Sequence, residues 1–283
     1  MPSRSPHSRH SLPLIVAHRG ASAHRAEHTM AAYVLALEQS ADGVECDVRL
    51  TRDGHLVCVH DRRVDRTSTG RGPVSTQNLA TLAAHDYGSW YDDLGVADDL
   101  VRQRVSGRST AGLLTLAELL GLVADCSRPV RLFVETKHPV RHSGLVEAKL
   151  VALLARYGLA APESKKGSTV LVMSFSARAL RRVRTAAPGL PTVQLMTNLR
   201  GLGSGELPFW ADVAGPGVHA LRADPGFVER AAAHGHPTYC WTVDEPADIG
   251  LCAEYGVSYL ATNRPGDARR VLRASSQPPT DTR

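Results

Sequence analysis

The chain has 283 residues, of which 43% are hydrophobic and 22% charged, so it is too apolar for a disordered protein and can bury a large core as one large or two small domains. Its 33 Lys and Arg residues exceed its 28 Asp and Glu residues, which favours anionic substrates or surfaces, although a solvated basic helix at 178–184 gives the same excess. No aromatic and basic RNA-binding signature occurs, so we expect no nucleic acid as a partner.

The ends of the chain and its cysteines give no targeting or metal-binding signal. Residues 1–11 are basic and polar, but the apolar run 12–17 is shorter than the core of a signal peptide, and no later run has the length of a membrane span. The five cysteines are odd in number and include no CxxC pair, which suggests neither a zinc site nor a disulfide framework. We therefore expect a cytoplasmic protein without a transmembrane segment, with disordered tails at 1–11 and 275–283.

Short apolar or β-branched runs alternate with stretches of helical periodicity along the chain. The runs predict strands at residues 14–17, 44–48, 130–136, 169–174, 192–196, 218–222, 238–243 and 257–262. The stretches between them predict helices at 29–41, 116–126, 145–157, 177–187, 226–234 and 246–255. This alternation is typical of βα units around a parallel sheet.

Signals for the beginnings and ends of helices support this division. Thr115 and Glu118 have the spacing of a capping box, and Ser176 and Asp244 stand at expected N-caps. Helix ends are expected at Gly158, Gly235 and Gly256. The repeats predict a single α/β domain at 12–274, a closed (β/α)8 TIM barrel with its active site at the C-terminal ends of the strands. An open doubly wound sheet is the alternative, but no glycine-rich GxGxxG follows any strand.

One segment interrupts the alternation. Residues 55–60 predict a strand that pairs with 44–48 across the turn Arg52-Asp53-Gly54. The residues after it, 61–115, are too many for an ordinary βα loop and are rich in Asp, Gly, Ser, Thr and Arg. We therefore expect an inserted lobe at about 61–115, after the second strand and over the mouth of the barrel.

Charged residues occur in pairs on two predicted strands. Glu45 and Asp47 are separated by one residue, so both side chains point to the same face. Two carboxylates this close repel each other, and a divalent cation relieves the repulsion, although two solvent-facing carboxylates on an edge strand would look the same. Glu135 and Lys137 repeat the spacing. Glu135 would complete a three-carboxylate metal site and Lys137 would meet a negatively charged substrate, unless the two form a simple ion pair.

Histidines follow two further strands. His18 and Arg19 come directly after the run 14–17, and Gly20 allows a close turn there. His60 ends the run 55–60 in the same way. A histidine pair is suited to act as acid and base on opposite sides of a phosphorus atom. Because the chain has 13 histidines, only the shared position at strand ends singles out these two.

A series of short motifs follows the chain in a fixed order. The N-terminal set is Val16-Ala17-His18-Arg19-Gly20, Glu27 with Thr29, Glu45-Cys46-Asp47-Val48, Thr51-Arg52-Asp53-Gly54 and His60-Asp61. The later set is Asp65-Arg66-Thr67, Leu114-Thr115-Leu116-Ala117-Glu118, Glu135-Thr136-Lys137, Ser174-Phe175, Trp241-Thr242-Val243 and Thr262-Asn263-Arg264-Pro265. Together they resemble the glycerophosphodiester phosphodiesterase family over nearly the whole chain.

The resemblance implies a TIM barrel with an inserted lobe, one divalent cation (Ca²⁺ or Mg²⁺) as cofactor, and hydrolysis of glycerophosphodiesters to an alcohol and sn-glycerol 3-phosphate. It also implies roles for matching residues: Glu45, Asp47 and Glu135 as metal ligands, His18 and His60 as the catalytic acid and base, and Arg19 and Lys137 as phosphate ligands. In such sites one histidine deprotonates the neighbouring glycerol hydroxyl and the other protonates the leaving alcohol. Water then opens the cyclic phosphate.

One motif departs from the family pattern. The usual Pro-Glu-Asn-Thr reads Ala26-Glu27-His28-Thr29, which loosens the loop and replaces an amide by a titratable ring. Glu27 remains, as an expected partner that orients the site. Trp241 ends the predicted seventh strand and forms either an apolar wall for the leaving group or part of the packing at the barrel rim.

Other functions fit parts of the pattern. A lysophospholipase D-type activity would use the same site, and a non-catalytic barrel-fold binding protein is a further alternative, against which the intact His18 and His60 argue. A metal-dependent barrel lyase would need a Lys base at a later strand end, which is missing. The leaving group, the choice between Ca²⁺ and Mg²⁺, the oligomeric state and peripheral contact with a membrane stay open.

Overall fold

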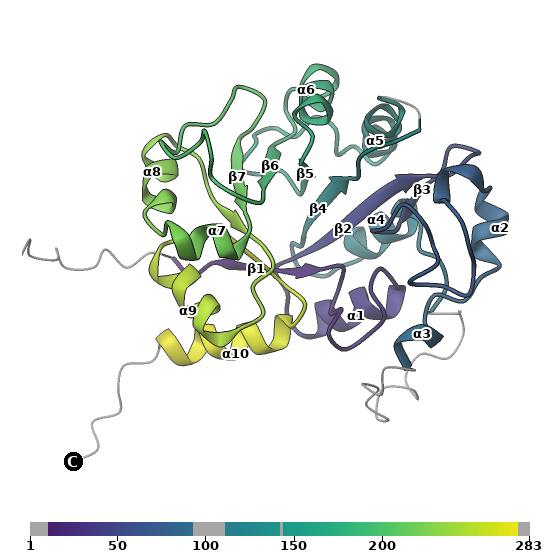
Figure 1. Cartoon of the computed structure of the whole chain (residues 1–283), viewed down its shortest axis with the longest axis horizontal. Helices are drawn as coiled ribbons and strands as arrows, with labels where there is room; N and C mark the ends of the chain where they lie inside the picture. The colour runs from purple at the N-terminus through teal and green to yellow at the C-terminus, as the bar shows by residue number, and fades with distance from the viewer. Residues whose placement is uncertain (1–10, 93–110, 142–143, 277–283) are drawn as a thin grey trace, which may run out of the picture.

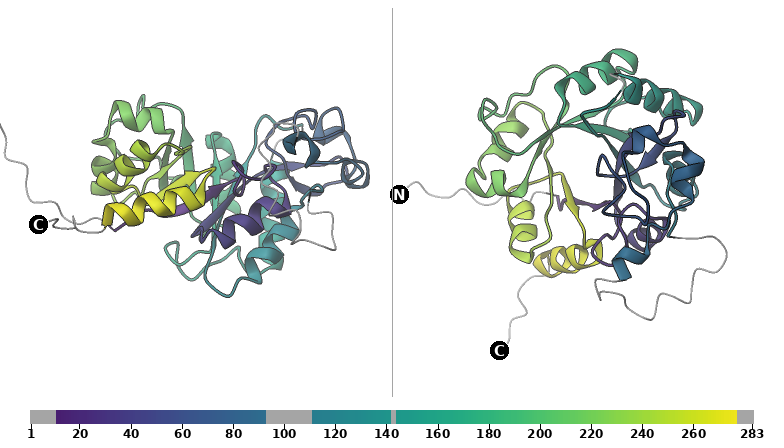
Figure 2. Two further views of the ribbon diagram at one scale, coloured as in Figure 1. Left: turned by 90° about the horizontal axis from the view of Figure 1, so that it is seen from below. Right: turned by 45° about the vertical axis from the view of Figure 1, so that its right-hand side comes forward.

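Eight parallel strands form the centre of the computed structural model, which describes residues 11–92, 111–141 and 144–276. They are β1 (Leu14–His18), β2 (Gly43–Leu50), β4 (Arg131–Thr136), β5 (Val170–Ser174), β6 (Thr192–Met196), β7 (Val213–Pro216), β8 (Tyr239–Cys240) and β9 (Tyr259–Thr262). Their order in the sheet is β7-β6-β5-β4-β2-β1-β9-β8. Parallel bridges from Ala214 to Thr238 and from Gly217 to Trp241 join β7 to the ends of β8 and close the ring (Figure 2). The predicted (β/α)8 barrel is confirmed.

Helices surround this ring of strands (Figure 1; Figure 2, right). They are α1 (Met30–Glu38), α4 (Leu116–Ala124), α5 (Leu145–Arg156), α6 (Ala177–Ala186), α7 (Val218–Ala223), α8 (Phe227–Ala233), α9 (Pro246–Glu254) and α10 (Pro265–Ser276). In α4, Leu116, Leu119, Leu120 and Val123 recur at helical spacing and are all buried, so this face packs against the strands. None of the described helices is long and apolar enough to cross a membrane.

Most of the predicted helix boundaries hold. Thr115 and Glu118 form the capping box at the start of α4, and the Ser176 hydroxyl accepts a hydrogen bond from the Ala179 N–H at the start of α6. The glycines expected at helix ends all have positive φ, 70° at Gly158, 78° at Gly235 and 76° at Gly256. This left-handed conformation ends a helix at low cost only in glycine.

The structure corrects one predicted strand. Residues 218–222 belong to helix α7, and the strand of this repeat is β7, whose sequence is Val-Ala-Gly-Pro. Glycine and proline are typical of turns, which hid this strand in the sequence. Gly215 is needed here because a Cβ would lie 2.9 Å from the carbonyl oxygen of Gln194 on β6. Val218 and Leu221, which suggested a strand, are buried residues of α7.

Two predictions near the C-terminus are also corrected. Glu245, not Asp244, is the N-cap of α9, and the Asp244 carboxylate instead accepts hydrogen bonds from Thr262 and Asn263. Helix α10, which the sequence pattern did not predict, continues to Ser276 and so extends into the segment expected to be a tail. The rest of the two predicted tails, 1–10 and 277–283, lies outside the described residues.

A separate group of short elements follows β2. β3 (Leu56–Cys58) pairs with β2 in antiparallel fashion, as predicted, and η1 (Val74–Thr76), α2 (Leu79–Ala83) and α3 (Ser89–Asp92) follow it. These elements lie beside the barrel (Figure 1, right). Val57, Val59, Val64, Val74, Leu82 and Tyr87 form a small core of their own. Residues 93–110 of the expected lobe lie outside the described residues.

Apolar side chains fill the interior of the barrel below the C-terminal ends of its strands. Phe133 of β4 is fully buried, and its ring centroid lies 5.2 Å from the rings of Tyr239 and Tyr259. Gly43 of β2 makes room for this ring, because a Cβ there would lie 3.2 Å from it. Burying a side chain of this size contributes about 1.5–3 kcal/mol. This apolar layer thus holds the strands together. The polar groups occupy the layer above it, at the C-terminal ends of the strands.

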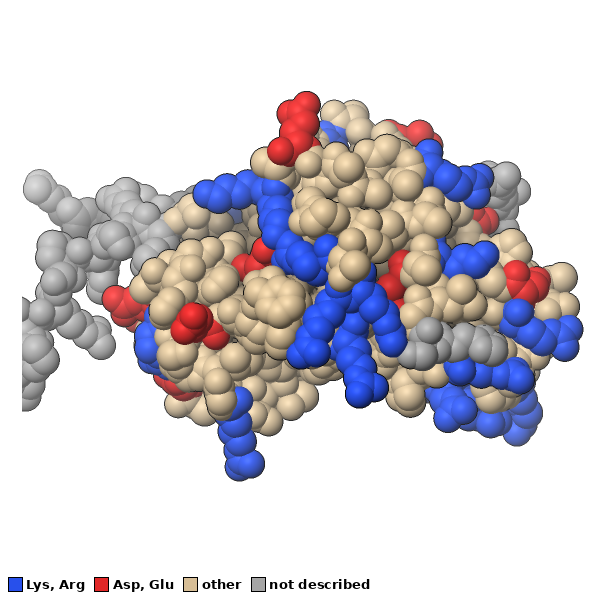
Figure 3. Space-filling view, turned by 90° about the horizontal axis from the view of Figure 1, so that it is seen from above, with Lys and Arg blue, Asp and Glu red and all other residues tan. Residues whose placement is uncertain are grey.

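The basic segment 178–184 lies on α6. Helix α6 lies at the top of the molecule in Figure 1. Figure 3 shows the molecule from that side, and Lys and Arg side chains gather in the middle of this face. The guanidinium carbon of Arg181 lies 4.0 Å from the centroid of the Trp210 ring, and Arg184 forms an ion pair with Asp212. Two of these arginines therefore attach the helix to the segment before β7.

Candidate active site

Three carboxylates meet at the C-terminal end of the barrel. Glu45 and Asp47 lie on β2 and Glu135 lies on β4, where Asp47 and Glu135 are direct neighbours in the parallel register. Side chains alternate along β2, so Cys46 and Val48 join the outer core while the two carboxylates point inward. One oxygen atom of each carboxylate lies within 4.8 Å of the others, and all three residues are buried.

Burial and mutual repulsion oppose the ionisation of this cluster. Burial, followed by the charge of Asp47, raises the pKa of Glu45 well above its usual range. The same two causes raise the pKa of Glu135 to about 8. For Asp47, burial acts in the same direction, but the hydrogen bond from His28 and the nearby cations hold its pKa well below the usual range. Additional positive charge at this point would therefore stabilise the ionised form of the cluster.

Two cations of the chain already contact the carboxylates. Nζ of Lys137 lies 2.9 Å from Oε1 of Glu135 and 3.3 Å from Oδ1 of Asp47. Nε of Arg19 lies 3.1 Å from Oδ2 of Asp47, and the Arg19 backbone N–H donates to Oε2 of Glu45 at 3.0 Å. Arg19 and Lys137 thus border the cluster, where they can also meet an anionic ligand.

The donor set of the cluster fits a hard divalent cation. All three groups are carboxylates, and Ca²⁺ and Mg²⁺ bind oxygen ligands of this kind. Zinc sites are usually built from cysteine and histidine, and neither residue type contributes to this cluster.

The turn after β1 has a strained backbone that brings Arg19 to the cluster. Arg19 has a φ of 58°, in the left-handed region that residues other than glycine rarely occupy. Gly20 follows with a φ of 83°, and a Cβ at this position would lie 2.7 Å from the backbone of Ala32. The predicted close turn therefore depends on glycine at position 20.

A chain of ion pairs and hydrogen bonds connects Arg19 to His60. Nη1 of Arg19 lies 3.2 Å from Oε1 of Glu27, and Arg66 donates to both oxygens of Glu27 at 2.7 and 2.8 Å. Nε of Arg66 also donates to Oδ2 of Asp61 at 2.7 Å, and the other oxygen of Asp61 lies 2.7 Å from Nδ1 of His60. Glu27 thus orients Arg19 and links it to the segment after β3.

Long-range hydrogen bonds fix the ring of His18. Nδ2 of Asn263 donates to Asp244 at 2.6 Å, which turns the amide oxygen of Asn263 toward Nδ1 of His18 at 2.8 Å. An amide oxygen can only accept, so Nδ1 carries the proton and Nε2 of the neutral ring has a free lone pair. Burial, followed by the charge of Arg19, lowers the pKa of His18 to about 4. His18 is therefore neutral at pH 7 and suited to accept a proton.

His60 has the same tautomer but a different electrostatic environment. Although burial acts against it, hydrogen bonds from Arg66 and His60 lower the pKa of Asp61 to about 2, so its carboxylate accepts the Nδ1 proton. Burial, together with the charges of Arg19 and Lys137, lowers the pKa of His60, against the opposing effect of Asp47 and Asp61. His60 thus has a carboxylate partner that stabilises its protonated form, whereas the partner of His18 is an uncharged amide.

His28 joins Asp47 to the helix behind β2. Its Nε2 lies 2.9 Å from Oδ2 of Asp47, and its Nδ1 lies 2.8 Å from the hydroxyl of Tyr33, which donates to the backbone oxygen of Glu45. His28 has a φ of 60°, a conformation in which asparagine and histidine are both enriched. This backbone explains how histidine occupies the position of the asparagine in the Pro-Glu-Asn-Thr pattern.

A cavity lies among these groups, and two aromatic rings contact each other at the ends of β5 and β8. The cavity has a volume of about 250 Å³ and is lined by His18, Arg19 and Glu27 together with residues that follow β9. Trp241, which follows β8, donates its indole N–H to the Gly215 oxygen at 2.8 Å and makes an edge contact with the half-exposed ring of Phe175. Trp241 therefore packs at the rim, as one of the two interpretations expected, and also presents a partly exposed face.

The structure brings most of the expected residues into one network of contacts: His18, Arg19, Glu27, Glu45, Asp47, His60, Glu135 and Lys137. Among the described contacts, those of Trp241 lie outside this network. Asn263, Asp244 and Tyr33 were missed as parts of the site. Asn263 directly follows β9, so the strand-end position that singled out His18 would have identified it as well.

Comparison with known sequences identifies relatives over almost the whole chain. Residues 18–267 match the Glycerophosphoryl diester phosphodiesterase family. A Mycobacterium tuberculosis protein named "Probable glycerophosphodiester phosphodiesterase 1" is 56% identical over 262 residues, which are 92% of each chain. A Bacillus subtilis protein named "Glycerophosphodiester phosphodiesterase" is 34% identical over 257 residues, which are 89% of this chain and 84% of that one.

Comparison with solved structures shows the same fold. The glycerophosphodiester phosphodiesterase of Agrobacterium tumefaciens is 26% identical, with a TM-score of 0.71 over 93% of this chain and 100% of the other. A phosphodiesterase of Oleispira antarctica, solved with the product sn-glycerol-3-phosphate, is 22% identical, with a TM-score of 0.78 over 93% and 97% of the two chains. The second likeness concerns the barrel architecture alone.

Proposed function

This chain belongs to the glycerophosphoryl diester phosphodiesterase family and is a phosphoric diester hydrolase, and we propose that it hydrolyses glycerophosphodiesters to an alcohol and sn-glycerol 3-phosphate. One observation carries the proposal: a buried cluster of three carboxylates lies beside two cations and two histidines at the mouth of the barrel. Phosphodiester cleavage needs these elements, namely charge stabilisation at phosphorus and proton transfer at two oxygens.

The cofactor in this proposal is one divalent cation, Ca²⁺ or Mg²⁺. Glu45, Asp47 and Glu135 would hold it, since their oxygen atoms converge and two of them resist ionisation without further positive charge. When bound, such an ion supplies Lewis acidity that stabilises negative charge on the phosphoryl oxygens. Arg19 and Lys137, which border the carboxylates, would bind the same oxygens as point charges.

In the first step His18 acts as the base. Its Nε2 lone pair removes the proton of the glycerol hydroxyl next to the phosphate, and this oxygen attacks phosphorus. The hydrogen bond from Nδ1 to Asn263 keeps the ring in the required tautomer, and a pKa of about 4 keeps it unprotonated at neutral pH.

His60 acts as the acid in the same step. Its proton goes to the oxygen of the leaving alcohol as the bond from phosphorus to that oxygen breaks, and a cyclic glycerol phosphate remains. Asp61, which accepts the Nδ1 proton of His60 at 2.7 Å, stabilises the protonated ring that this role requires. In the second step the two histidines exchange roles, and water opens the ring to give sn-glycerol 3-phosphate.

The decisive experiment measures release of glycerol 3-phosphate from glycerophosphocholine. EDTA-treated protein should be inactive, and added Ca²⁺ or Mg²⁺ should restore turnover in the wild type but not in His18→Ala. His219→Ala, which removes an exposed histidine of α7, is the matched control and should behave like the wild type. Full activity of the EDTA-treated protein would refute the metal requirement, and wild-type activity of His18→Ala would refute the assigned base.

A further inference from the structure

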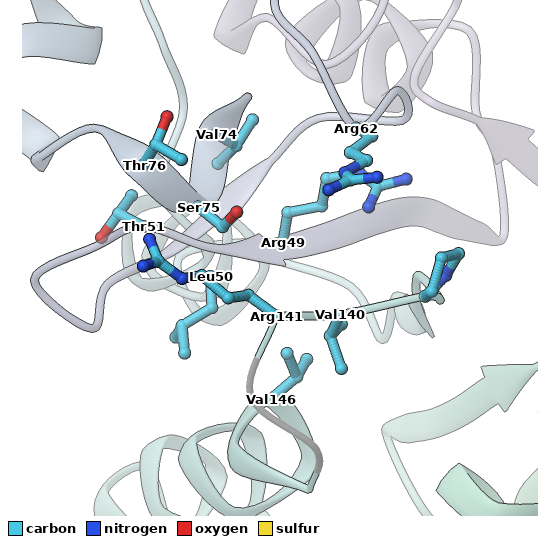
Figure 4. Close-up of a pocket in the computed structure, with 11 residues that line it drawn as sticks. Arg49, Leu50, Thr51, Arg62, Val74, Ser75, Thr76, Val140, Arg141 and Val146 are labelled. Carbon is cyan, nitrogen blue, oxygen red and sulfur yellow. The ribbon is translucent and has the colours of Figure 1, made fainter. Parts of the chain in front are cut away.

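A second cavity lies between the β2–β3 hairpin, η1 and the segment that follows β4 (Figure 4). Its volume is about 280 Å³. The polar part of its lining consists of Arg49, Arg62 and Arg141 and of the hydroxyl-bearing residues Thr51, Ser75 and Thr76. Among the described residues, no aspartate or glutamate lines this cavity. A cavity with three guanidinium groups and no acidic side chain has the composition of an anion site.

The positive charges of this cavity are incompletely paired. Nε and Nη2 of Arg49 donate to the backbone oxygen of His60 at 3.0 and 2.8 Å, which fixes the direction of its guanidinium. In the described part of the chain, the guanidinium groups of Arg62 and Arg141 have neither a hydrogen-bond nor an ion-pair partner. In Figure 4, Arg62 extends toward Arg49, and Arg141 extends toward Thr51 on the other side of the cavity.

Arg49 and Arg62 also repel each other. The guanidinium groups of Arg49 and Arg62 lie close together in Figure 4 and carry the same charge. An anion bound between these groups would remove this repulsion and accept several charge-assisted hydrogen bonds at once. Ser75, whose hydroxyl is shown within the same group of side chains, offers a further donor.

The cavity is built from the same strand ends as the active site. Arg49 lies two residues after Asp47, Arg62 lies two residues after His60, and Arg141 lies four residues after Lys137. Leu50, Val140 and Val146 contribute apolar wall between the arginines. The lining thus fits a negatively charged group carried on a short carbon skeleton.

We propose that this cavity binds a phosphate group, and that during the reaction it receives a second phosphate carried by the alcohol moiety of the substrate. The substrate part of this inference rests on the proposed function. A free phosphate ligand would meet the same arginines, so the experiment below separates the two sources.

The first measurement compares two substrates that differ by one phosphate, glycerophosphoglycerol and its terminal phosphate ester. In the double variant Arg62→Gln, Arg141→Gln, we expect KM for the phosphorylated substrate to rise at least 10-fold, since two charge-assisted contacts are lost. KM and kcat for glycerophosphoglycerol should stay within about twofold, because neither arginine touches the carboxylates or histidines. The matched control is Arg156→Gln, Arg178→Gln, which removes two exposed charges from α5 and α6.

The second measurement is calorimetric titration of inorganic phosphate into the metal-free full-length protein. We expect binding to the wild type and to the control variant, and at least 10-fold weaker binding to the double variant. Loss of phosphate binding with an unchanged KM would keep the anion site and identify a free phosphate as its ligand. If neither quantity differs between the double variant and its control, the inference is overturned. If the wild type turns over neither substrate, the proposed function fails, while the titration still decides the cavity.

Discussion

The barrel has two sides whose strands end differently. β4, β2, β1 and β9 are neighbours in the sheet, and groups of the candidate active site lie at or near their C-terminal ends: Glu135, Asp47, His18 and Asn263. β5, β6, β7 and β8 form the other side, and Ser174, Met196, Pro216 and Trp241 lie at their ends. Both sides have the same βα architecture, so the fold provides the position of the site but not its chemistry.

Burying charged groups on the first of these sides costs free energy. Burial opposes the ionised forms of Glu45 and Glu135; the surrounding cations offset part of this cost, and the proposed divalent cation would offset more of it. The uncharged ends of the other side carry no such cost. Groups with strongly shifted pKa values cluster at catalytic sites. The side formed by β4, β2, β1 and β9, called the polar side below, is therefore the candidate site.

The largest effect should come from the histidines of the polar side. We expect His18→Ala and His60→Ala each to lower kcat by about 10²–10⁴-fold, because each removes a proton-transfer group. Melting temperature and metal affinity should change little, since neither ring is a proposed metal ligand. Steady-state kinetics measures kcat, thermal unfolding the melting temperature, and calorimetry the metal affinity. A histidine variant that retains the wild-type kcat would contradict the assignment of the chemistry to this side of the barrel.

A smaller loss should follow from Asp244→Asn. This isosteric change removes the acceptor that orients the Asn263 amide, so the amide can turn and favour the wrong tautomer of His18. We expect kcat to fall about 10- to 100-fold, the range seen for partners that orient a site. Asp248→Asn is the control, because it removes another carboxylate, one that pairs with Arg222 and makes no described contact with Asn263 or His18. An equal loss of kcat in both variants would show that Asp244 affects activity through the stability of the fold and not through the orientation of Asn263.

Glu27→Gln tests the ion pairs that support the polar side. Burial opposes the charge of Glu27, but Arg66 and Arg19 lower its pKa to about 2 from an ordinary 4.5. A carboxyl group whose pKa is lower in the folded state stabilises the protein above its unfolded pKa and loses this contribution as the pH falls. We expect the variant to lose about 1–3 kcal/mol of unfolding free energy at pH 7. The difference should shrink below about pH 4.5. Urea unfolding at several pH values checks this, and a difference independent of pH would exclude the charge as its cause.

The smallest effect is expected on the opposite side of the barrel. Met196→Leu at the end of β6 conserves volume, so it should cost less than about 1.5 kcal/mol of stability and leave kcat unchanged within about twofold. The same kinetic assay and urea unfolding apply. A loss of kcat as large as that of Asp244→Asn would show that the side formed by β5, β6, β7 and β8 takes part in the chemistry.

Sequence patterns alone were sufficient for much of this arrangement. The alternation of short apolar runs and helical periods predicted the barrel, because strand and helix spacing are local properties of the chain. The i, i+2 spacing of Glu45 and Asp47 placed both carboxylates on one face, and the position of His18 at the end of β1 placed it at the mouth. The motifs that resemble the family added the reaction.

Tertiary structure decided what depends on residues far apart in the chain. β7 was hidden because Gly215 and Pro216 resemble a turn, and only close packing against β6 requires the glycine. The tautomer of His18 depends on Asn263, 245 residues away, whose own orientation depends on Asp244. Such contacts leave no periodic pattern in a sequence, because they follow from the closure of the barrel, which brings the ends of β9 and β1 side by side.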